Sequence, residues 1–390
     1  MVSNWPEYPL TDFYDISSGL SKPAADFGSG HPFVSFKDVF GNYFLPDELV
    51  QLVQSTDQER KKCSVKRGDV FLTRTSETMH ELGMSSVALR DYENATFNGF
   101  TKRLRPKPDC ELVPEYVGYY LRSPRFRHSM LAFSTMSTRA SLNNEMIGRL
   151  TIEVPPRPVQ QSIAHVLKTL DEKVALNRQM NETLEQMAQA LFKSWFVDFD
   201  PVIDNALDAG NPIPEELEAR AEQRRQLRNA VALGEASAPS LPDEIRSLFP
   251  SEFELTDDMG WIPKGWAAST VGNVVNRLKV KKRYKKQDVE KFGIIPVYEQ
   301  GSDIVLGYHN ASPDLIADAN NPIFIFGDHT CVTELSIRPF SISANVIPLE
   351  GKGFSTYWVY YAIQGKQKFE EYRRHWMEFI IKPLVLPSIN

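Results

Sequence analysis

The chain has 390 residues, of which 42% are hydrophobic and 24% charged, a composition typical of globular proteins with two or three domains. It contains no apolar run long enough to predict a membrane span, and its first residues lack the basic and apolar segments of a secretory signal. Three widely spaced cysteines exclude a disulfide framework and a cysteine-rich zinc site, and favour a cytoplasmic location.

The formal net charge of −6 argues weakly against nucleic acid as a partner, but this average hides one strongly basic segment. Residues 277–286, RLKVKKRYKK, contain seven Lys and Arg residues and no acid, whereas acidic residues cluster in 215–222 and 252–258. Such asymmetry indicates an anionic partner. A solvated charged loop or helix face is the alternative interpretation.

Residues 1–156 are predicted to form a first globular unit of mixed, β-rich structure. Gly and Pro separate short apolar runs such as HPFVSF (31–36) and GDVFLTR (68–74), which indicates strands. Residues 113–131 have the spacing of a helix, in which Pro124 is either an interruption or a new start.

Residues 157–200 are predicted to form one long helix, because apolar residues recur three and four positions apart. They are Ile163, Val166, Leu170, Met180, Leu184, Met187 and Leu191. A helix roughly 55–60 Å long should project from a small domain and find a partner helix. Asn177 lies where an apolar residue is due, so it either fixes the register of a coiled coil or faces water where the helix rotates.

Residues 201–260 are interpreted as a linker rich in Pro, Gly, Ala and Asp, with one short amphipathic helix in EELEARAEQRRQLRNAV. Residues 261–390 then repeat the first pattern: a strand with a polar loop, a strand, a helix beginning with paired aromatic residues, and an apolar strand ending in Pro. The predicted fold class is therefore α+β, with two similar mixed α/β domains joined by a long coiled-coil-type helix.

The sequence contains no recognisable catalytic motif. GKGFST (351–356) lacks the spacing of a phosphate-binding loop, and the seven histidines are dispersed, so no metal site is predicted. NPIF (321–324) resembles the Asn-Pro-Pro-aromatic loop of amino-methyltransferases. However, Ile323 replaces the second proline and no glycine-rich cofactor loop precedes it, so a turn entering a strand is favoured.

Residues 155–202, PPRPVQQSIAHVLKTLDEKVALNRQMNETLEQMAQALFKSWFVDFDPV, resemble the central conserved region of the specificity subunits of Type I restriction–modification systems. The strongest match is LFKSWFVDF (191–199). LFPSEFELTDDMGWIPKGW (248–266) is similar to the start of the second globular unit in that family.

The resemblance implies two target-recognition domains, each reading one half of a bipartite target in double-stranded DNA, held apart by conserved helices. It implies a chain that is not itself an enzyme and binds no cofactor. Its expected partners are two adenine methyltransferase subunits, which carry S-adenosylmethionine, and a translocating endonuclease subunit. A methyltransferase or nuclease acting alone is the competing class, but it requires a cofactor or metal site that the sequence does not display.

Polar and basic residues near the predicted strand ends are the candidate DNA contacts, since Arg and Lys bind phosphates and Arg and Gln read base edges. In the first unit they are Arg74, Thr75, Ser76, Lys102, Arg103, Arg105, Arg139 and Ser141. In the second unit they are Lys279, Lys281, Lys282, Arg283, Lys285, Lys286, Gln300, His329, Thr330, Arg373 and Arg374. For each residue, a solvent-facing polar side chain without such a role is the alternative.

The candidate residues of the helix seam or of subunit docking lie on the long helix. They are Ile163, Val166, Leu170, Asn177, Leu184, Leu191, Trp195 and Phe196. The aromatic residues at the helix end either pack against a globular unit or form a docking patch for a methyltransferase subunit.

The final apolar run, PLVLP (383–387), is predicted to be the closing strand of the second unit, equivalent to LTIEVPP. The family normally has a second long helix at this point, which packs against the first. We expect the apolar stripe to pair instead with a second copy, a separate helix fragment or methyltransferase helices. The alternative function is a truncated homologue that acts as an assembly, decoy or half-specificity protein.

Overall fold

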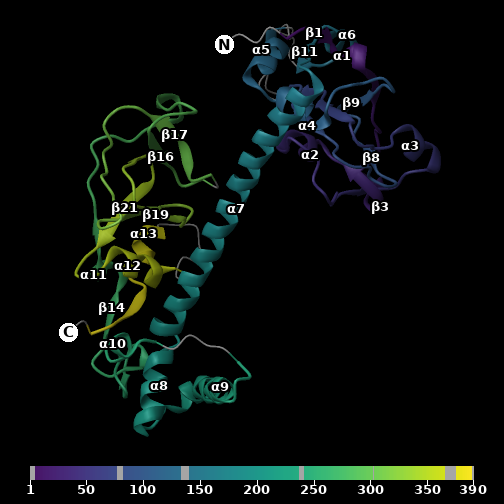
Figure 1. Ribbon diagram of the computed structural model, residues 1–390. Coiled ribbons are helices and arrows are strands. Elements are labelled where there is room, and N and C mark those ends of the chain that lie inside the picture. Colours follow the sequence, from purple (N-terminus) through teal and green to yellow (C-terminus); the bar gives the residue numbers. More distant parts are fainter. Residues whose placement is uncertain are drawn as a thin grey trace. The chain divides into compact units, whose positions relative to one another are not determined.

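The computed structural model describes residues 5–76, 82–132, 140–236, 241–301, 303–364 and 375–388. The chain forms two compact units, Met1–Gln179 and Met180–Asn390. The boundary between them lies within α7 (Arg157–Phe196), a continuous helix of 40 residues (Figure 1). The long helix expected from the apolar spacing is therefore present.

The first unit contains two main sheets. One is antiparallel, in the order β2 (Tyr14–Ser18), β9 (Thr101–Pro106), β5 (Val70–Thr73) and β7 (Ser85–Val87). The other has the order β4 (Leu52–Val53), β3 (Phe27–Val34) and β8 (Thr96–Phe97), with β8 parallel to β3. Two short strand pairs complete it: β1 (Glu7–Pro9) with β11 (Thr151–Glu153), and β6 (Thr75–Ser76) with β10 (Ala140–Ser141).

Six short helices accompany these strands in the described part of the first unit. They are α1 (Leu10–Phe13), α2 (Phe36–Gly41), α3 (Asp57–Lys62), α4 (Pro114–Tyr120), α5 (Pro124–Ala132) and α6 (Asn144–Gly148). Pro124 opens α5, so it starts a new helix rather than interrupting one. This position suits proline, because the first turn of a helix leaves backbone N–H groups without partners.

The second unit repeats this topology. Its antiparallel sheet has the order β15 (Val275–Arg277), β21 (Val346–Gly351), β18 (Ile323–Gly327) and β19 (Thr333–Ser336). Its second sheet has the order β17 (Val305–His309), β16 (Ile295–Tyr298) and β20 (Ser341–Ile342), again with a parallel pair. β14 (Ala267–Thr270) pairs with β22 (Pro383–Leu386) as β1 pairs with β11. The internal repeat and the α+β fold class are therefore confirmed.

Short helices occupy matching places in the second unit. They are α11 (Val271–Val274), α12 (Thr356–Ile363) and α13 (His375–Phe379). The fully buried strands β5 (VFLT) and β18 (IFIFG) lie inside their sheets, which explains their continuous apolar runs. Around them, α4 and Ala164 of α7 join the core of the first unit, whereas α12 joins that of the second.

The interpretation of residues 201–260 as a linker is wrong, because this segment is folded. It contains α8 (Asp200–Ala209), α9 (Glu215–Ala232), α10 (Asp243–Arg246) and the hairpin of β12 (Phe253–Thr256) and β13 (Gly260–Pro263). The short amphipathic helix predicted here is α9. Pro201 lies in the first turn of α8 and Gly210 is its left-handed C-cap, so these residues mark helix ends rather than a disordered linker.

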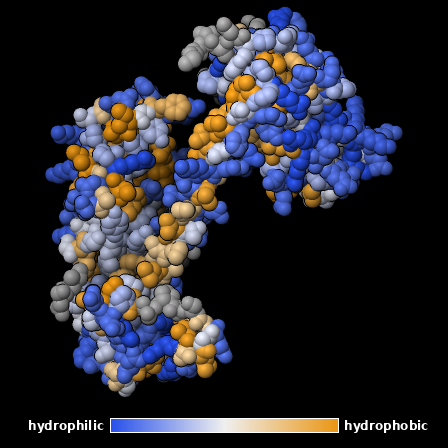
Figure 2. Space-filling model, viewed as in Figure 1, coloured by the Kyte–Doolittle hydropathy of each residue, from blue (hydrophilic) through white to orange (hydrophobic). Residues whose placement is uncertain are grey.

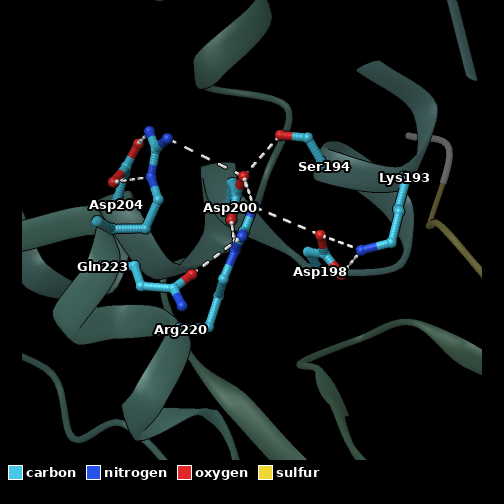
Figure 3. A network of polar contacts seen from close by, with 8 residues as sticks. Lys193, Ser194, Asp198, Asp200, Asp204, Arg220 and Gln223 are labelled. Atoms are coloured by element: carbon cyan, nitrogen blue, oxygen red, sulfur yellow. Dashed lines mark hydrogen bonds and ion pairs between the residues drawn. The ribbon is translucent and has the colours of Figure 1, made fainter. Parts of the chain in front are cut away.

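A polar network holds α9 against the end of α7 and the start of α8 (Figure 3). The buried Asp200 carboxylate accepts hydrogen bonds from Ser194 Oγ and from Nε and Nη2 of Arg220, each at 2.7 Å. Arg224 pairs with Asp204 in the same network. The segment is thus fixed by charge-assisted hydrogen bonds as well as by apolar contacts.

Gln160 fixes the start of α7 to the first unit and gives a testable prediction. Its side chain is 1% exposed, accepts a hydrogen bond from Val113 N and donates one to Pro155 O, both at 2.9 Å. Gln160→Ala leaves both backbone groups without partners, which should lower the free energy of unfolding by about 1–3 kcal/mol. Urea denaturation, with hydrogen exchange at the Val113 amide, measures this loss. The exposed neighbour Gln161→Ala is the control, and equal effects of the two variants would contradict the assignment.

Candidate nucleic-acid interface

The polar loops that follow the two buried strands occupy equivalent positions in the repeat. Thr73 of β5 pairs with Thr101 of β9, and Gly327 of β18 pairs with Val346 of β21, at the same place in the two sheets. The three residues after each strand therefore correspond: Arg74, Thr75 and Ser76 in the first unit, and Asp328, His329 and Thr330 in the second. Five of these six residues were predicted as DNA contacts, and they occupy the same position within each of the two units.

The structure brings several of the predicted contact residues together. Thr75 pairs with Ser141 in the small β6–β10 sheet, so two loops that are distant in sequence meet beside the exposed Arg74. In the second unit, the Gln300 side-chain oxygen accepts a hydrogen bond from His329 N at 3.0 Å. Gly327 lies between Gln300 and Thr330, because a Cβ there would come within 2.8 Å of both side chains. The predicted residues Arg139, Arg373 and Arg374 lie outside the described residues.

The basic strand predicted at Lys102, Arg103 and Arg105 is not an open cationic surface. Lys102 is 8% exposed and donates to Ser18 Oγ and Asn144 Oδ1, both at 2.9 Å. Arg103 is 6% exposed and donates to Ser64 O at 2.6 Å. Burial lowers the pKa of both groups.

Arg105 is also used inside the fold. It makes two hydrogen bonds, at 2.8 and 2.6 Å, to the fully buried carboxylate of Asp69. Hydrogen bonding to this carboxylate raises the Arg105 pKa. The three cations thus join β9 to neighbouring segments of the first unit, so their interpretation as open DNA contacts is wrong.

The basic segment of the second unit has the opposite character. Its five candidate lysines are exposed, and none of them pairs with a carboxylate among the residues that the structure describes. They are Lys279, Lys281, Lys282, Lys285 and Lys286. By contrast, Arg220, Arg224 and Arg228 of α9 all pair with aspartates of α8. Lys282 Nζ also lies over the Tyr284 ring, 4.1 Å from its centre. A dense group of exposed cations that lacks carboxylate partners within the described residues favours an anionic ligand.

Two residues anchor this basic segment to the sheet. Tyr284 is buried, its N donates to Ile342 O at 3.0 Å, and its ring stacks on His309 with centroids 4.4 Å apart. Arg283 donates to the carbonyls of Ser343 and Val346 at 2.9 and 2.8 Å. Arg283 is therefore a structural residue of the segment rather than a free phosphate contact, and burial lowers its pKa.

The basic segment between the edge strand β15 and the anchor residue Tyr284 is longer than the equivalent segment of the first unit, which runs from β2 to Leu20. Leu20 N donates to Phe97 O as Tyr284 N donates to Ile342 O, so Leu20 and Tyr284 correspond. Lys279 corresponds to Ser18 by the sheet register, so the second unit has three additional residues before this anchor. Arg277, which is exposed on β15, extends the cationic group but was not among the predicted contacts.

The apolar stripe on α7 is exposed. Val166, Leu170, Leu184 and Leu191 are between 50% and 57% exposed. Figure 2 shows apolar residues along α7 in orange. Asn177 on the stripe is also exposed, whereas Ile163 packs against the core of the first unit and does not belong to the free stripe.

Trp195 and Phe196 are partly buried and pack against a core cluster of the second unit, which favours the packing interpretation over the docking patch. The Trp195 ring lies against Phe249 with centroids 5.7 Å apart. Phe196 contacts Trp266 and Trp358, both at 6.0 Å. These aromatic residues join the end of α7 to the β12–β13 hairpin and to α12.

Comparison with known proteins relates the chain to one family. Residues 2–186 match the family model described as Type I restriction modification DNA specificity domain. The chain is 32% identical over 295 residues to the Type I restriction enzyme HindI specificity subunit of Haemophilus influenzae, which covers 70% of this chain. The chain is similar to the specificity subunits of Type I restriction–modification systems. The resemblance to this family that the sequence indicates is thereby confirmed, and the specificity subunits of these systems recognise DNA without being the catalytic components.

The match covers only part of the relatives' length. The chain spans 61% of the HindI specificity subunit. It spans 50% of the MjaIX specificity subunit of Methanocaldococcus jannaschii, to which it is 25% identical over 57% of its own length. The solved S subunit of a Type I system from M. genitalium aligns with 100% of this chain and 87% of that chain, with 12% identity and a TM-score of 0.49. Among the described residues of this specificity-subunit homologue, no helix is long and apolar enough to cross a membrane.

Proposed function

We propose that this chain selects a bipartite DNA target for a Type I methyltransferase and endonuclease complex. Each repeated unit reads one part of the target, and the chain itself does no chemistry. The repeat of one topology with different residues at equivalent loop positions is the observation that carries this proposal. A recognition site used twice with Arg74 in one copy and Asp328 in the other suits an asymmetric target.

The five exposed lysines, which have no carboxylate partner among the described residues, support DNA as the ligand of the second unit. Phosphate contacts hold a protein on the duplex and make affinity fall steeply with salt. We expect the chain, weakly alone and tightly with its methyltransferase partner, to bind target DNA with such a salt dependence. Fluorescence anisotropy at several salt concentrations tests this. No affinity at low salt, with or without the partner, contradicts the proposal.

We further infer that α7 sets the separation of the two DNA-reading units. Forty residues at about 1.5 Å each give a helix of roughly 60 Å, which is long enough to leave untouched base pairs between two contacts. S-adenosylmethionine is expected on the methyltransferase subunits, which supply the methyl-transfer chemistry. The endonuclease subunit is expected to join this complex.

The exposed stripe of α7 is proposed to bind helices of a methyltransferase subunit, of a separate fragment or of a second copy. The double variant Leu170→Gln and Leu184→Gln removes two exposed apolar side chains that such a partner would bury. We expect the affinity for the partner to fall by about 3–6 kcal/mol, from burial of roughly 1.5–3 kcal/mol per leucine. Co-purification and light scattering measure this. The control Lys168→Gln, which removes an exposed charge of the same helix, should assemble normally. Normal assembly of the double variant contradicts the assignment.

A further inference from the structure

The turn between β8 and β9 in the first unit presents an aromatic side chain to solvent. Phe100 is 62% exposed, although a phenyl ring of this kind gains stability when it is buried. Arg74, which follows β5 and is also exposed, donates its backbone N–H to Phe100 O at 2.8 Å. The Arg74 and Phe100 side chains therefore start from neighbouring points of the surface.

The backbone of this turn is fixed by contacts that do not involve the ring. Phe100 N donates to Asn98 Oδ1 at 2.7 Å, and Gly99 N donates to Leu20 O at 2.7 Å. A Cβ at Gly99 would lie 2.6 Å from Ser21 Oγ and 2.9 Å from Leu20 O, so this close approach requires glycine. A rigid backbone that presents an exposed aromatic ring loses little conformational entropy on binding, which is a property of recognition surfaces.

The second unit has the same arrangement with different side chains. Asp328 N donates to Asn345 O at 2.9 Å, as Arg74 N donates to Phe100 O. Asn345 is exposed and has a φ of 59°, a left-handed conformation that asparagine tolerates. One position in the fold thus carries Arg with Phe in one unit and Asp with Asn in the other. A conserved docking site for a protein partner would require similar chemistry in both copies, whereas two different DNA half-sites require different chemistry.

Building on the proposed function, we propose that these two pairs are the base-reading residues of the chain. In the first unit, Arg74 reads a guanine through O6 and N7, and the Phe100 ring contacts the methyl group of a neighbouring thymine. In the second unit, Asp328 accepts from a cytosine amino group, and Asn345 reads an adenine. Each assignment follows from the donors, acceptors and methyl groups that base pairs present in the major groove.

Substitution of thymine by deoxyuridine tests the Phe100 contact, because it removes only the methyl group. With the assembled methyltransferase complex, each thymine of the first half-site is replaced in turn and the affinity is measured. We expect the replacement of one particular thymine to lower the DNA affinity of the wild-type complex by about 3- to 10-fold, which is the effect of losing one buried methyl group. Phe100→Ala should bind both DNAs with equal affinity. If no thymine shows this loss, or if Phe100→Ala retains it, the assignment is overturned.

Arg74→Gln tests the other member of the pair. We expect it to reduce discrimination at one G·C pair of the same half-site by roughly 5- to 100-fold and to leave the other half-site unchanged. Val50→Ala, at an 89% exposed position of the same unit, is the control that should change nothing. If the wild-type complex binds no specific DNA, the proposed function itself fails. If it binds, and Phe100→Ala impairs only assembly with the methyltransferase, then Phe100 is a protein contact and the base-reading assignment is wrong.

Discussion

Replacing Lys281, Lys282, Lys285 and Lys286 with glutamine is expected to weaken DNA binding by roughly 100- to 1,000-fold at 0.1 M salt. Each phosphate contact contributes about 0.9 to the slope of log K against log[salt]. The variant should therefore reduce that slope by about 3 to 4, with no change in preferred sequence. These lysines are exposed and, within the described residues, pair with no carboxylate. Lys282 also contacts the Tyr284 ring, a cation–π contact of about 0.5–1 kcal/mol, so glutamine should disturb the fold only slightly. Anisotropy titrations over a range of salt concentrations measure both quantities.

Two controls separate phosphate binding from stability. Lys264 is exposed but paired with Glu252 on the β12–β13 hairpin, so Lys264→Gln should leave the salt slope unchanged. Arg283→Gln removes the anchor to the carbonyls of Ser343 and Val346, so it should lower the stability of the second unit as well as DNA affinity. An unchanged slope in the quadruple lysine variant would show that this segment does not contact the phosphates.

Asp200→Ala is expected to destabilise the second unit by about 3 kcal/mol. The carboxylate is 4% exposed and accepts hydrogen bonds from Ser194 and Arg220. Removing one partner of a buried ion pair costs about 3–5 kcal/mol, because the remaining charge loses its compensation. The Arg220 side chain is 36% exposed and can turn toward water, so we expect the lower end of this range. Urea denaturation, observed through tryptophan fluorescence, measures the change.

Glu218→Gln is the matched control, because it breaks an ion pair with Arg225 at the exposed surface of the same helix. Exposed pairs contribute less than about 1 kcal/mol. If Asp200→Ala costs no more than Glu218→Gln, the network does not fix α9 to the end of α7.

The apolar stripe and the basic run could be predicted because each is encoded by residues close together in the sequence. The apolar spacing of Val166, Leu170 and Leu184 predicts an exposed stripe without knowledge of any other segment, and the stripe is present. The run at 277–286 similarly concentrates charge in a few residues. The repeat could be found from the order of strands and loops, since each unit has to bury its own core.

Lys102, Arg103 and Arg105 could not be placed from their own sequence. Their run resembles a basic edge strand, but β9 lies between β2 and β5. The groups that accept their hydrogen bonds come from elsewhere: Ser18, Asn144, Ser64 and Asp69. Only the tertiary fold brings these acceptors to the strand, so the strand sequence by itself does not distinguish a surface cation from a buried one.

The spacing of charged residues in the segment after α7 indicates that this segment is folded. Aspartates recur every four residues in α8, and arginines recur every four residues in α9. The ion pairs join Asp200 to Arg220, Asp204 to Arg224 and Asp208 to Arg228. Two i, i+4 rows of opposite charge predict two helices that face each other. The content of Pro and Gly concealed this pattern.

Mapping adenine methylation in cells that carry this chain and its partner subunits is the most direct test of the central claim. We predict a target of two short parts separated by a fixed number of unspecified base pairs. Exchanging Asp328, His329 and Asn345 for residues of different chemistry should alter only one of the two parts. A single uninterrupted target, or a change in both parts after this exchange, would contradict the account.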